Sequence, residues 1–340
     1  MSSYTGPAES PSTRGYFLAL VDVFIRKQNY PCHLPTILNL ILFKTADPDQ
    51  YVRKSAVQLL QLIEERFFMA SLVADYSISL TSSLPTTYKQ SQQILSARLA
   101  QDHVGLTTEL LCEMTRRVTL VPGMRQRDML TIVLPWIGNL KSLDNSSTSW
   151  VILTNLFFLT VKFGDEYVKE IESLWVKLTE DSPQNVVQIV SFLLKTGLSI
   201  RNVDFASHAK KVIVYIGRTR VCKNVINCLV EHIVPDLNMS ETVSTAFTMA
   251  PASAANLSRA GSTEQLTTVG AAAPSTTNGL YMASLTSVLP TPDVLSSSGA
   301  SMLGTVATSA SSLSTRNISK SELAFILLVD LTIEVKRMKK

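Results

Sequence analysis

The stretch from Asp47 to Phe68 constrains the fold most, because it carries the start signals and the periodicity of one amphipathic helix. Asp47 is the expected N-cap, since its carboxylate can accept hydrogen bonds from the first unpaired amides. Pro48 follows at the first helical position, where its missing N–H costs nothing, and Gln50 can complete a capping box. Apolar side chains then recur at steps of three and four residues, which predicts one buried stripe: Val52, Ala56, Leu59, Leu60, Ile63 and Phe67.

The same stretch resembles the second helix of a HEAT repeat. Such repeats carry an aspartate, then a Val-Arg pair, then alanine and leucine at helical spacing. The matching residues here are Asp49, Val52, Arg53, Ala56 and Leu60. We expect Asp49 and Arg53 to form an ion pair across one helical turn. We also expect both residues to serve stacking and capping between repeats before they serve binding.

Helical patterns separated by short turns continue through most of the chain. The tripeptide Asp181-Ser182-Pro183 repeats the start signal that opens the first stretch. The period is irregular, about 30–50 residues, which is typical of HEAT or armadillo units. We therefore predict an all-α fold, an α-solenoid of HEAT/armadillo-like helical repeats. The predicted helices span 15–28, 31–44, 48–68, 88–101, 106–118, 125–140, 150–163, 165–179, 183–197, 204–216 and 219–234.

Five local features refine this pattern. Asp75–Leu84 alternates only weakly, so we predict a loop with one extended piece there. Pro135 is expected to kink or break its helix. Ser149 is the expected N-cap of the following helix. Gly164 and Gly197 are expected to end the helices that precede them.

The composition divides the chain into four parts. Residues 1–14 are rich in Ser, Thr, Pro and Gly and are predicted to be disordered. Residues 15–235 form the helical-repeat region. Residues 236–318 are mostly Ser, Thr, Ala, Gly and Pro, which predicts a low-complexity, disordered linker. Residues 319–340 are again helical and are interpreted as the start of a further repeat, so we expect this chain to be one piece of a longer solenoid.

Bulk properties limit the class of protein. The 340 residues are 46% hydrophobic, yet they hold no run of about 18 uncharged apolar residues, so no transmembrane helix is predicted. The N-terminus lacks the apolar core of a signal peptide, which favours the cytoplasm. Four cysteines without paired spacing indicate reduced thiols. The net charge of +4 is too small to indicate a nucleic-acid partner by itself.

The sequence offers little for catalysis. It contains no phosphate-binding glycine loop, no His-Glu-x-x-His and no Gly-x-Ser-x-Gly. Cys222, Cys228 and His232 are the nearest approach to a metal or catalytic site, but zinc requires four ligands in closer register. We therefore predict no enzyme, no catalytic residues, no metal site and no cofactor. An unrecognised site around these three residues stays open as an alternative.

Basic residues at helix ends are the candidate binding positions. Cations there favour the C-terminal helix dipole and solubility, which is the simpler interpretation. Alternatively, adjacent repeats align them into a basic ridge for an acidic protein or for nucleic acid. The candidate positions are Arg116, Arg117, Arg125, Arg127, Lys210, Lys211, Arg218 and Arg220.

Several separate blocks, in order, resemble the central region of the Furry family, also called cell morphogenesis proteins. The resemblance covers about residues 15–235 and leaves out the Ser-rich tract. The blocks that carry it are 47–60 (DPDQYVRKSAVQLL), 88–92 (YKQSQ), 115–118 (TRRV), 134–136 (LPW), 155–157 (NLF), 180–187 (EDSPQNVV) and 210–215 (KKVIVY).

The resemblance implies a very large, non-catalytic HEAT/armadillo-like scaffold. Furry proteins act with NDR-type kinases and their Mob co-activators in polarised growth, cell shape and neurite patterning. They occur at the cell cortex and at sites of growth, and some associate with microtubules. The resemblance therefore implies protein partners of these kinds, and it carries over no catalytic residues.

Overall fold

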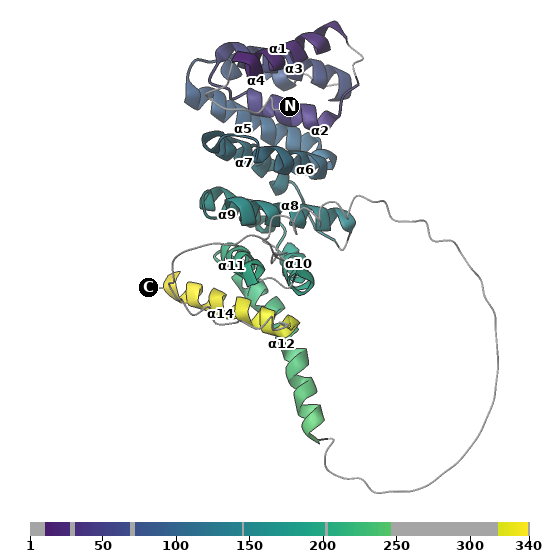
Figure 1. Cartoon of the computed structure of the whole chain (residues 1–340), viewed down its shortest axis with the longest axis vertical. Helices are drawn as coiled ribbons and strands as arrows, with labels where there is room; N and C mark the ends of the chain where they lie inside the picture. Colours follow the sequence, from purple (N-terminus) through teal and green to yellow (C-terminus); the bar gives the residue numbers. More distant parts are fainter. Residues whose placement is uncertain are drawn as a thin grey trace, which may run out of the picture.

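The computed structural model describes residues 11–27, 31–68, 72–144, 146–200, 203–245 and 319–338. Within these ranges all regular structure is helical, which confirms the all-α prediction (Figure 1). The helices are α1 (Pro11–Arg26), α2 (Leu34–Lys44), α3 (Gln50–Ile63), the π-helical turn η1 (Glu64–Phe68), α4 (Leu72–Leu80), α5 (Pro85–Asp102), the 3-10 turn η2 (Val104–Leu106), α6 (Thr107–Val118), α7 (Gly123–Gly138), α8 (Ser147–Phe163), α9 (Val168–Glu180), α10 (Asn185–Ile200), α11 (Val203–Gly217), α12 (Cys222–Thr245) and α14 (Lys320–Met338).

The helices stack in two columns, as a solenoid requires (Figure 1). One column runs α2, α6, α8, α10, α12, and each of these helices packs on the next. The other column begins with α1, α3 and α4 and continues through α5, α7, α9, α11 and α14. Pairs such as α6 with α7 and α8 with α9 join the two columns. Each such pair is one repeat.

Hydrogen bonds between neighbouring repeats reveal the period. Trp136 Nε1 donates to Ser96 Oγ, 40 residues earlier, at 3.0 Å. Leu143 N donates to Asn185 Oδ1, 42 residues later, at 2.8 Å. A separation of about 40–45 residues is the period of HEAT and armadillo units. The core is continuous along the stack, from Phe17 in α1 to Leu331 in α14.

The opening helix starts two residues later than predicted. Asp49 is its N-cap, and the carboxylate of this residue accepts hydrogen bonds from Tyr51 N and Val52 N. The prediction that Asp47 caps the helix was wrong. Asp47 is buried, and its Oδ1 accepts from Asp49 N at 3.0 Å while its Oδ2 lies 3.3 Å from Lys44 Nζ. A cation from the preceding helix therefore holds the residue that looked like a cap.

The predicted apolar stripe is buried except at its last member. Val52, Ala56, Leu59, Leu60 and Ile63 are at most 1% exposed, whereas Phe67 is 38% exposed. The chain turns through the π-helical η1 after Ile63, and this wider turn changes the register of the stripe.

Other local predictions have mixed outcomes. Gly164 is the C-cap of α8, as expected, but Ser146 rather than Ser149 is the N-cap of that helix, because Ser146 Oγ accepts from Ser149 N. Gly197 does not end a helix, since α10 continues to Ile200. Pro135 lies inside α7, which runs on to Gly138.

The predicted loop Asp75–Leu84 was largely wrong, since α4 occupies Leu72–Leu80. Only Val73 and Leu80 of α4 are buried, so its apolar pattern is weak. Packing between α3 and α5 holds it, and the carboxylate of Glu64 accepts from Val73 N at 2.9 Å near its start. Tertiary contacts thus stabilise a helix that local sequence does not indicate.

Two helices cross boundaries that the composition predicted. Helix α1 begins at Pro11, inside the predicted disordered segment 1–14, and α12 continues to Thr245, inside the predicted linker. The helix interpreted as the start of a further repeat, α14, packs on α11 and α12 and so pairs with α12 in the stack. Residues 246–318 lie outside the described residues. Among the described helices, none is both long and apolar enough to cross a membrane.

Candidate partner-binding surface

An ion-pair ladder joins the helices of the column α5, α7, α9, α11 and α14. Each pair links a basic side chain on one helix, or directly after it, to an acidic side chain on a neighbouring helix. The ladder consists of Lys89–Asp128 (3.0 Å), Arg127–Glu170 (2.5 Å), Arg218–Glu172 (3.3 Å), Arg218–Glu334 (2.7 Å) and Lys210–Asp330 (2.8 Å). Three candidate binding residues, Arg127, Lys210 and Arg218, therefore hold neighbouring repeats together.

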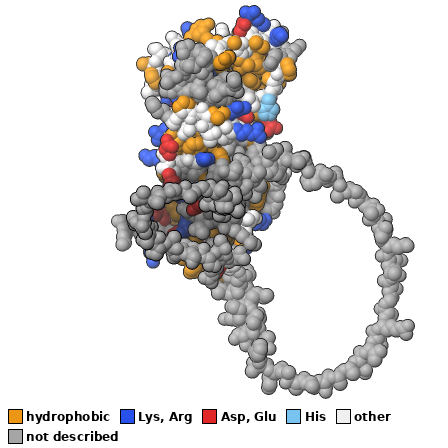
Figure 2. Space-filling model, viewed as in Figure 1, with side chains coloured by type: hydrophobic (Ala, Val, Ile, Leu, Met, Phe, Trp, Pro, Cys, Tyr) orange, Lys and Arg blue, Asp and Glu red, His pale blue; other side chains and the backbone are white. Residues whose placement is uncertain are grey.

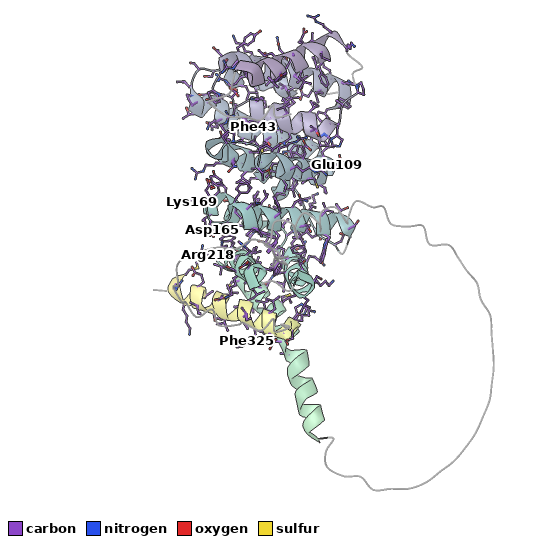
Figure 3. The ribbon with its side chains drawn as sticks, viewed as in Figure 1. Phe43, Glu109, Asp165, Lys169, Arg218 and Phe325 are labelled. Carbon is purple, nitrogen blue, oxygen red and sulfur yellow. The ribbon has the colours of Figure 1, made fainter. Side chains whose placement is uncertain are left out.

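Charges alternate along the visible face of the stack. Figure 2 shows Lys and Arg side chains beside Asp and Glu side chains among the coloured residues, without one large basic patch. Asp165, Lys169 and Arg218 lie near the helices α9 and α11 in Figure 3. Such exposed pairs contribute about 0.2–1 kcal/mol each. Each pair of the ladder therefore adds little to the free energy of unfolding.

Lys211 and Arg220 also have partners. Lys211 Nζ lies 2.7 Å from Asp165 Oδ1, and the hydrogen bond from Lys211 lowers the pKa of Asp165. Arg220 donates a hydrogen bond to the main-chain oxygen of Glu180. Both contacts tie α11 or the loop after it to the preceding repeat.

Arg125 is not a surface residue. It is buried, and its guanidinium lies 4.6 Å from the centre of the Phe43 ring. Its Nε is 3.3 Å from Asp128 Oδ2, and its Nη1 is 3.9 Å from Asp47 Oδ2. Arg125 thus joins α7 to α2 and to the α2–α3 loop, a role that its position at a helix end did not indicate.

The two arginines at the end of α6 differ. Arg117 Nε is 2.7 Å from Glu113 Oε1 in the same helix, whereas Arg116 is exposed. Neither lies in the column that carries the ladder. The eight candidates therefore do not form one basic ridge among the described residues, although Arg116, Arg127, Arg218 and Arg220 remain exposed to solvent.

Arg53 is the residue whose role the sequence described only in part. Its side chain is 1% exposed, and no ion pair joins it to Asp49, which instead lies 2.7 Å from Arg14 Nη1. Arg53 Nε donates to Leu80 O at 3.0 Å and Nη1 donates to Asp47 O at 2.7 Å. Further bonds reach the main-chain oxygens of Pro48 and Ser82, and the guanidinium stacks 4.0 Å from the Tyr88 ring centre. The predicted i,i+4 pair was wrong, but the stacking role of Arg53 between helices is present.

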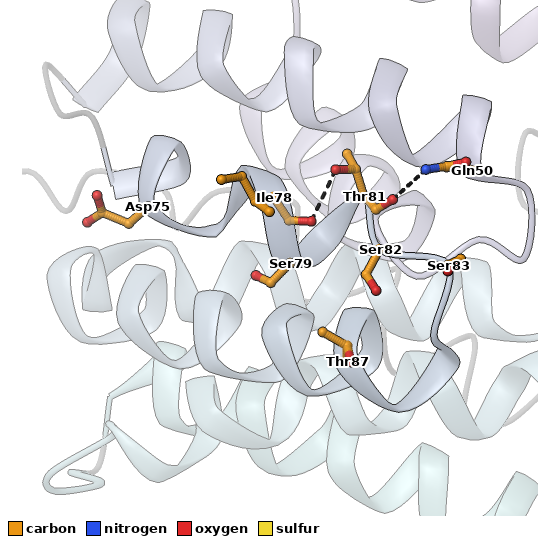
Figure 4. A pocket seen from close by; sticks show the side chains of 8 residues that line it. All are labelled: Gln50, Asp75, Ile78, Ser79, Thr81, Ser82, Ser83 and Thr87. Carbon is orange, nitrogen blue, oxygen red and sulfur yellow. Dashed lines mark hydrogen bonds between the residues drawn. The ribbon is translucent and has the colours of Figure 1, made fainter.

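A groove next to this arginine lies between the start of α3, α4 and the start of α5 (Figure 4). Its volume is about 550 Å³, and serine and threonine side chains dominate its lining. Gln50 Nε2 donates to Thr81 O at 2.7 Å, and Thr81 Oγ1 donates to Ile78 O at 3.2 Å. Ile78 is 86% exposed. Hydroxyl groups therefore surround one exposed apolar side chain in this groove.

The alternative site around Cys222, Cys228 and His232 lacks the expected chemistry. Cys228 is buried, and burial raises the pKa of its thiol, so the thiol stays protonated at neutral pH. Burial also lowers the pKa of His232. In the part of the chain that the structure describes, no three His, Cys, Asp or Glu side chains are placed to hold a metal ion.

Comparison with known families decides what kind of stack this is. The family model described as the cell morphogenesis central region matches residues 4–328. This chain belongs to that family. The match confirms the resemblance seen in the sequence, and it extends beyond residue 235 into α14.

Two curated relatives have names that refer to cell morphogenesis or cell polarity. Over 227 residues, or 65% of this chain, it is 24% identical to "Cell morphogenesis protein PAG1" of Saccharomyces cerevisiae and shares 26% identity with "Cell polarity protein mor2" of Schizosaccharomyces pombe. The matched parts are 9% and 10% of those proteins, so the chain spans about a tenth of their length. No solved structure matches the chain significantly.

Proposed function

We propose that this chain is part of a non-catalytic scaffold for cell morphogenesis and polarised growth, including the control of cell and neurite shape. Its membership of the cell morphogenesis central region family carries this proposal. The names of both relatives agree with it. The two-column stack supports a scaffold because such stacks present long surfaces to several partners.

The proposed partners are an NDR-type kinase and its Mob co-activator, with microtubules as a further contact. The proposed location is the cytoplasm, at the cell cortex and at cytoskeletal sites of polarised growth. The family resemblance supports both proposals.

A non-catalytic role agrees with the chemistry of the described side chains. The Cys228 thiol is buried and has a raised pKa, and several of the candidate basic residues form ion pairs between repeats. A protein partner would be bound through the shape and the charge of the surface outside these pairs.

Arg127 is the proposed partner contact with the sharpest test. Its side chain is 60% exposed although it pairs with Glu170. Exchange of the two charges, Arg127→Glu with Glu170→Arg, keeps an ion pair between α7 and α9 but reverses the charge at the exposed position. A partner that contacts Arg127 should lose affinity for this double variant. The helical content and the unfolding midpoint of the variant should stay close to those of wild type.

Affinity capture tests the proposed function itself. The folded, tagged chain should recover an NDR-type kinase together with Mob from cell extract, and the charge-exchanged double variant should recover less. Lys54→Glu is a matched control, because Lys54 is exposed on the opposite side of α3 from the core. Recovery of neither protein by a chain with a native helical spectrum would contradict the proposal.

The alternative is a helical-repeat adaptor that binds acidic partners or nucleic acid through its basic helix ends. Binding of that kind weakens steeply as salt rises. The ladder already engages several of those side chains, which favours the scaffold proposal. RNA or DNA binding with a steep salt dependence would favour the alternative.

A further inference from the structure

The last helix, α14, fills a groove made by three other helices. It packs against α10, α11 and α12 (Figure 1). Its buried side chains, Leu323, Ala324, Leu327 and Leu331, lie at most 3% exposed and occupy one face of the helix. The opposite face carries Phe325, which is 57% exposed and is labelled in Figure 3. One face alone therefore makes the contact.

Two glycines shape the groove to receive leucines. A Cβ atom on Gly197 of α10 would lie 2.6 Å from Leu323 Cδ2, which is too close for any real contact. A Cβ atom on Gly217, at the end of α11, would overlap Leu331 Cδ1. Each glycine thus leaves a hole that one leucine fills. The spacing of the two holes matches leucines eight residues apart on one helical face.

Two cations beside the groove match two acids on α14. Lys210 Nζ lies 2.8 Å from Asp330 Oδ2, and Arg218 Nη2 lies 2.7 Å from Glu334 Oε1. Lys210 lies on α11 and Arg218 directly follows that helix, while the two acids are one turn apart on α14. The groove therefore recognises a helix by leucines in two holes and by two acids beside them.

The connection between groove and helix is long. Residues 246–319 separate the end of α12 from α14 in the sequence. The cost of closing a loop rises with its length, so such a connection favours the chain's own helix less than a short turn would. Every contact described above would be the same if a second copy supplied the helix, which is the condition for domain swapping.

We propose that the groove of α10, α11 and α12 is a helix-binding site that the α14 of a second copy of this chain can fill. Two copies then pair by exchanging α14. The holes at Gly197 and Gly217 and the cations Lys210 and Arg218 determine which helix fits. The outer face of α14, with Phe325, Val329 and Ile333, takes no part in this pairing.

Complementary charge reversals test the proposal on the full chain. Lys210→Glu places an acid in the groove beside the chain's own Asp330, and Asp330→Lys places a base on the helix beside its own Lys210. Each variant alone has a mismatched pair.

When the two variants are mixed, exchange of α14 sets the introduced glutamate of one chain against the introduced lysine of the other. The second groove of the same dimer regains the natural Lys210–Asp330 pair. We expect mixed dimers to exceed same-variant dimers roughly tenfold by native mass spectrometry, because both mismatches are removed.

Phe325→Ser is the matched control, since it changes an exposed residue of the same helix. Pairing should be unchanged in this variant. Loss of pairing in Phe325→Ser would place the interface on the outer face and overturn the proposal. Equal amounts of mixed and same-variant dimers, or no dimers at any concentration while circular dichroism shows both variants folded, would overturn it as well.

Discussion

Replacement of Arg53 by alanine should destabilise the first repeats strongly. The guanidinium links α3 to the end of α4 and to the loop after it through the main-chain oxygens of Leu80 and Ser82. It also closes the turn before α3 through the oxygens of Asp47 and Pro48. Alanine removes all of these bonds at once and leaves the buried oxygens without their donor.

The expected loss of unfolding free energy follows mainly from the most deeply buried contacts of Arg53. The bonds to Leu80 O and Asp47 O are buried, and hydrogen bonds to charged groups contribute about 1.5–3 kcal/mol each. Loss of the stacking on Tyr88 adds roughly 1 kcal/mol. The bonds to Pro48 O and Ser82 O are only partly buried and add less. We expect the free energy of unfolding to fall by at least about 4 kcal/mol.

Urea unfolding followed by circular dichroism measures this loss, and amide exchange should localise it to α3, α4 and α5. Lys54→Ala is the control, because this neighbour on α3 is exposed and its loss should change stability by less than about 0.5 kcal/mol. Arg53→Lys should recover only part of the stability, since an ammonium cannot reproduce the planar fork. An Arg53→Ala variant as stable as Lys54→Ala, or one that folds normally yet fails to bind a partner, would refute the reasoning.

Three further changes test other contacts by urea unfolding. Asp49→Ala removes a helix cap and should cost about 1 kcal/mol of unfolding free energy. Asp47→Ala takes the carboxylate from two buried cations and should cost about 3–5 kcal/mol. Equal losses in the two variants would contradict the assignment of Asp49 as the cap. Burial raises the pKa of Glu64, so wild type should lose stability as pH rises through that folded pKa, while Glu64→Gln should not; parallel pH profiles would contradict this. Gly217→Ala forces a methyl group against Leu331 and should cost about 1–3 kcal/mol, and an unchanged midpoint would show that the hole is not tight.

The sequence predicted the elements whose signals are local. The stripe from Val52 to Ile63 is buried as its periodicity indicated, because one face of an amphipathic helix must be covered. The choice between Asp47 and Asp49 as cap could not be made locally, since both carboxylates precede the helix. Lys44, three residues earlier, and Arg125 of α7 both lie against the Asp47 carboxylate, and the contact with Arg125 depends on how α7 packs near α2.

The candidate site was less predictable because its contacts join residues about one repeat apart. Arg127 and Glu170 are 43 residues apart, and Arg218 and Glu172 are 46 apart. Basic residues at helix ends indicated the sign of the charge at those positions, but the register between repeats determines their partners. The burial of Arg125 against Phe43 likewise follows from the stacking of α7 near α2.

Exchange of the matching region tests the central claim most directly. In this experiment the chain replaces the segment of the Schizosaccharomyces pombe cell polarity protein that it matches, and polarised growth is measured alongside the amount of the chimeric protein. A stable chimera that keeps polarised growth, together with an Arg53→Ala chimera that loses both protein and polarity, is the predicted result. A chimera present at normal levels that fails to support polarised growth would contradict a scaffold role for this stack.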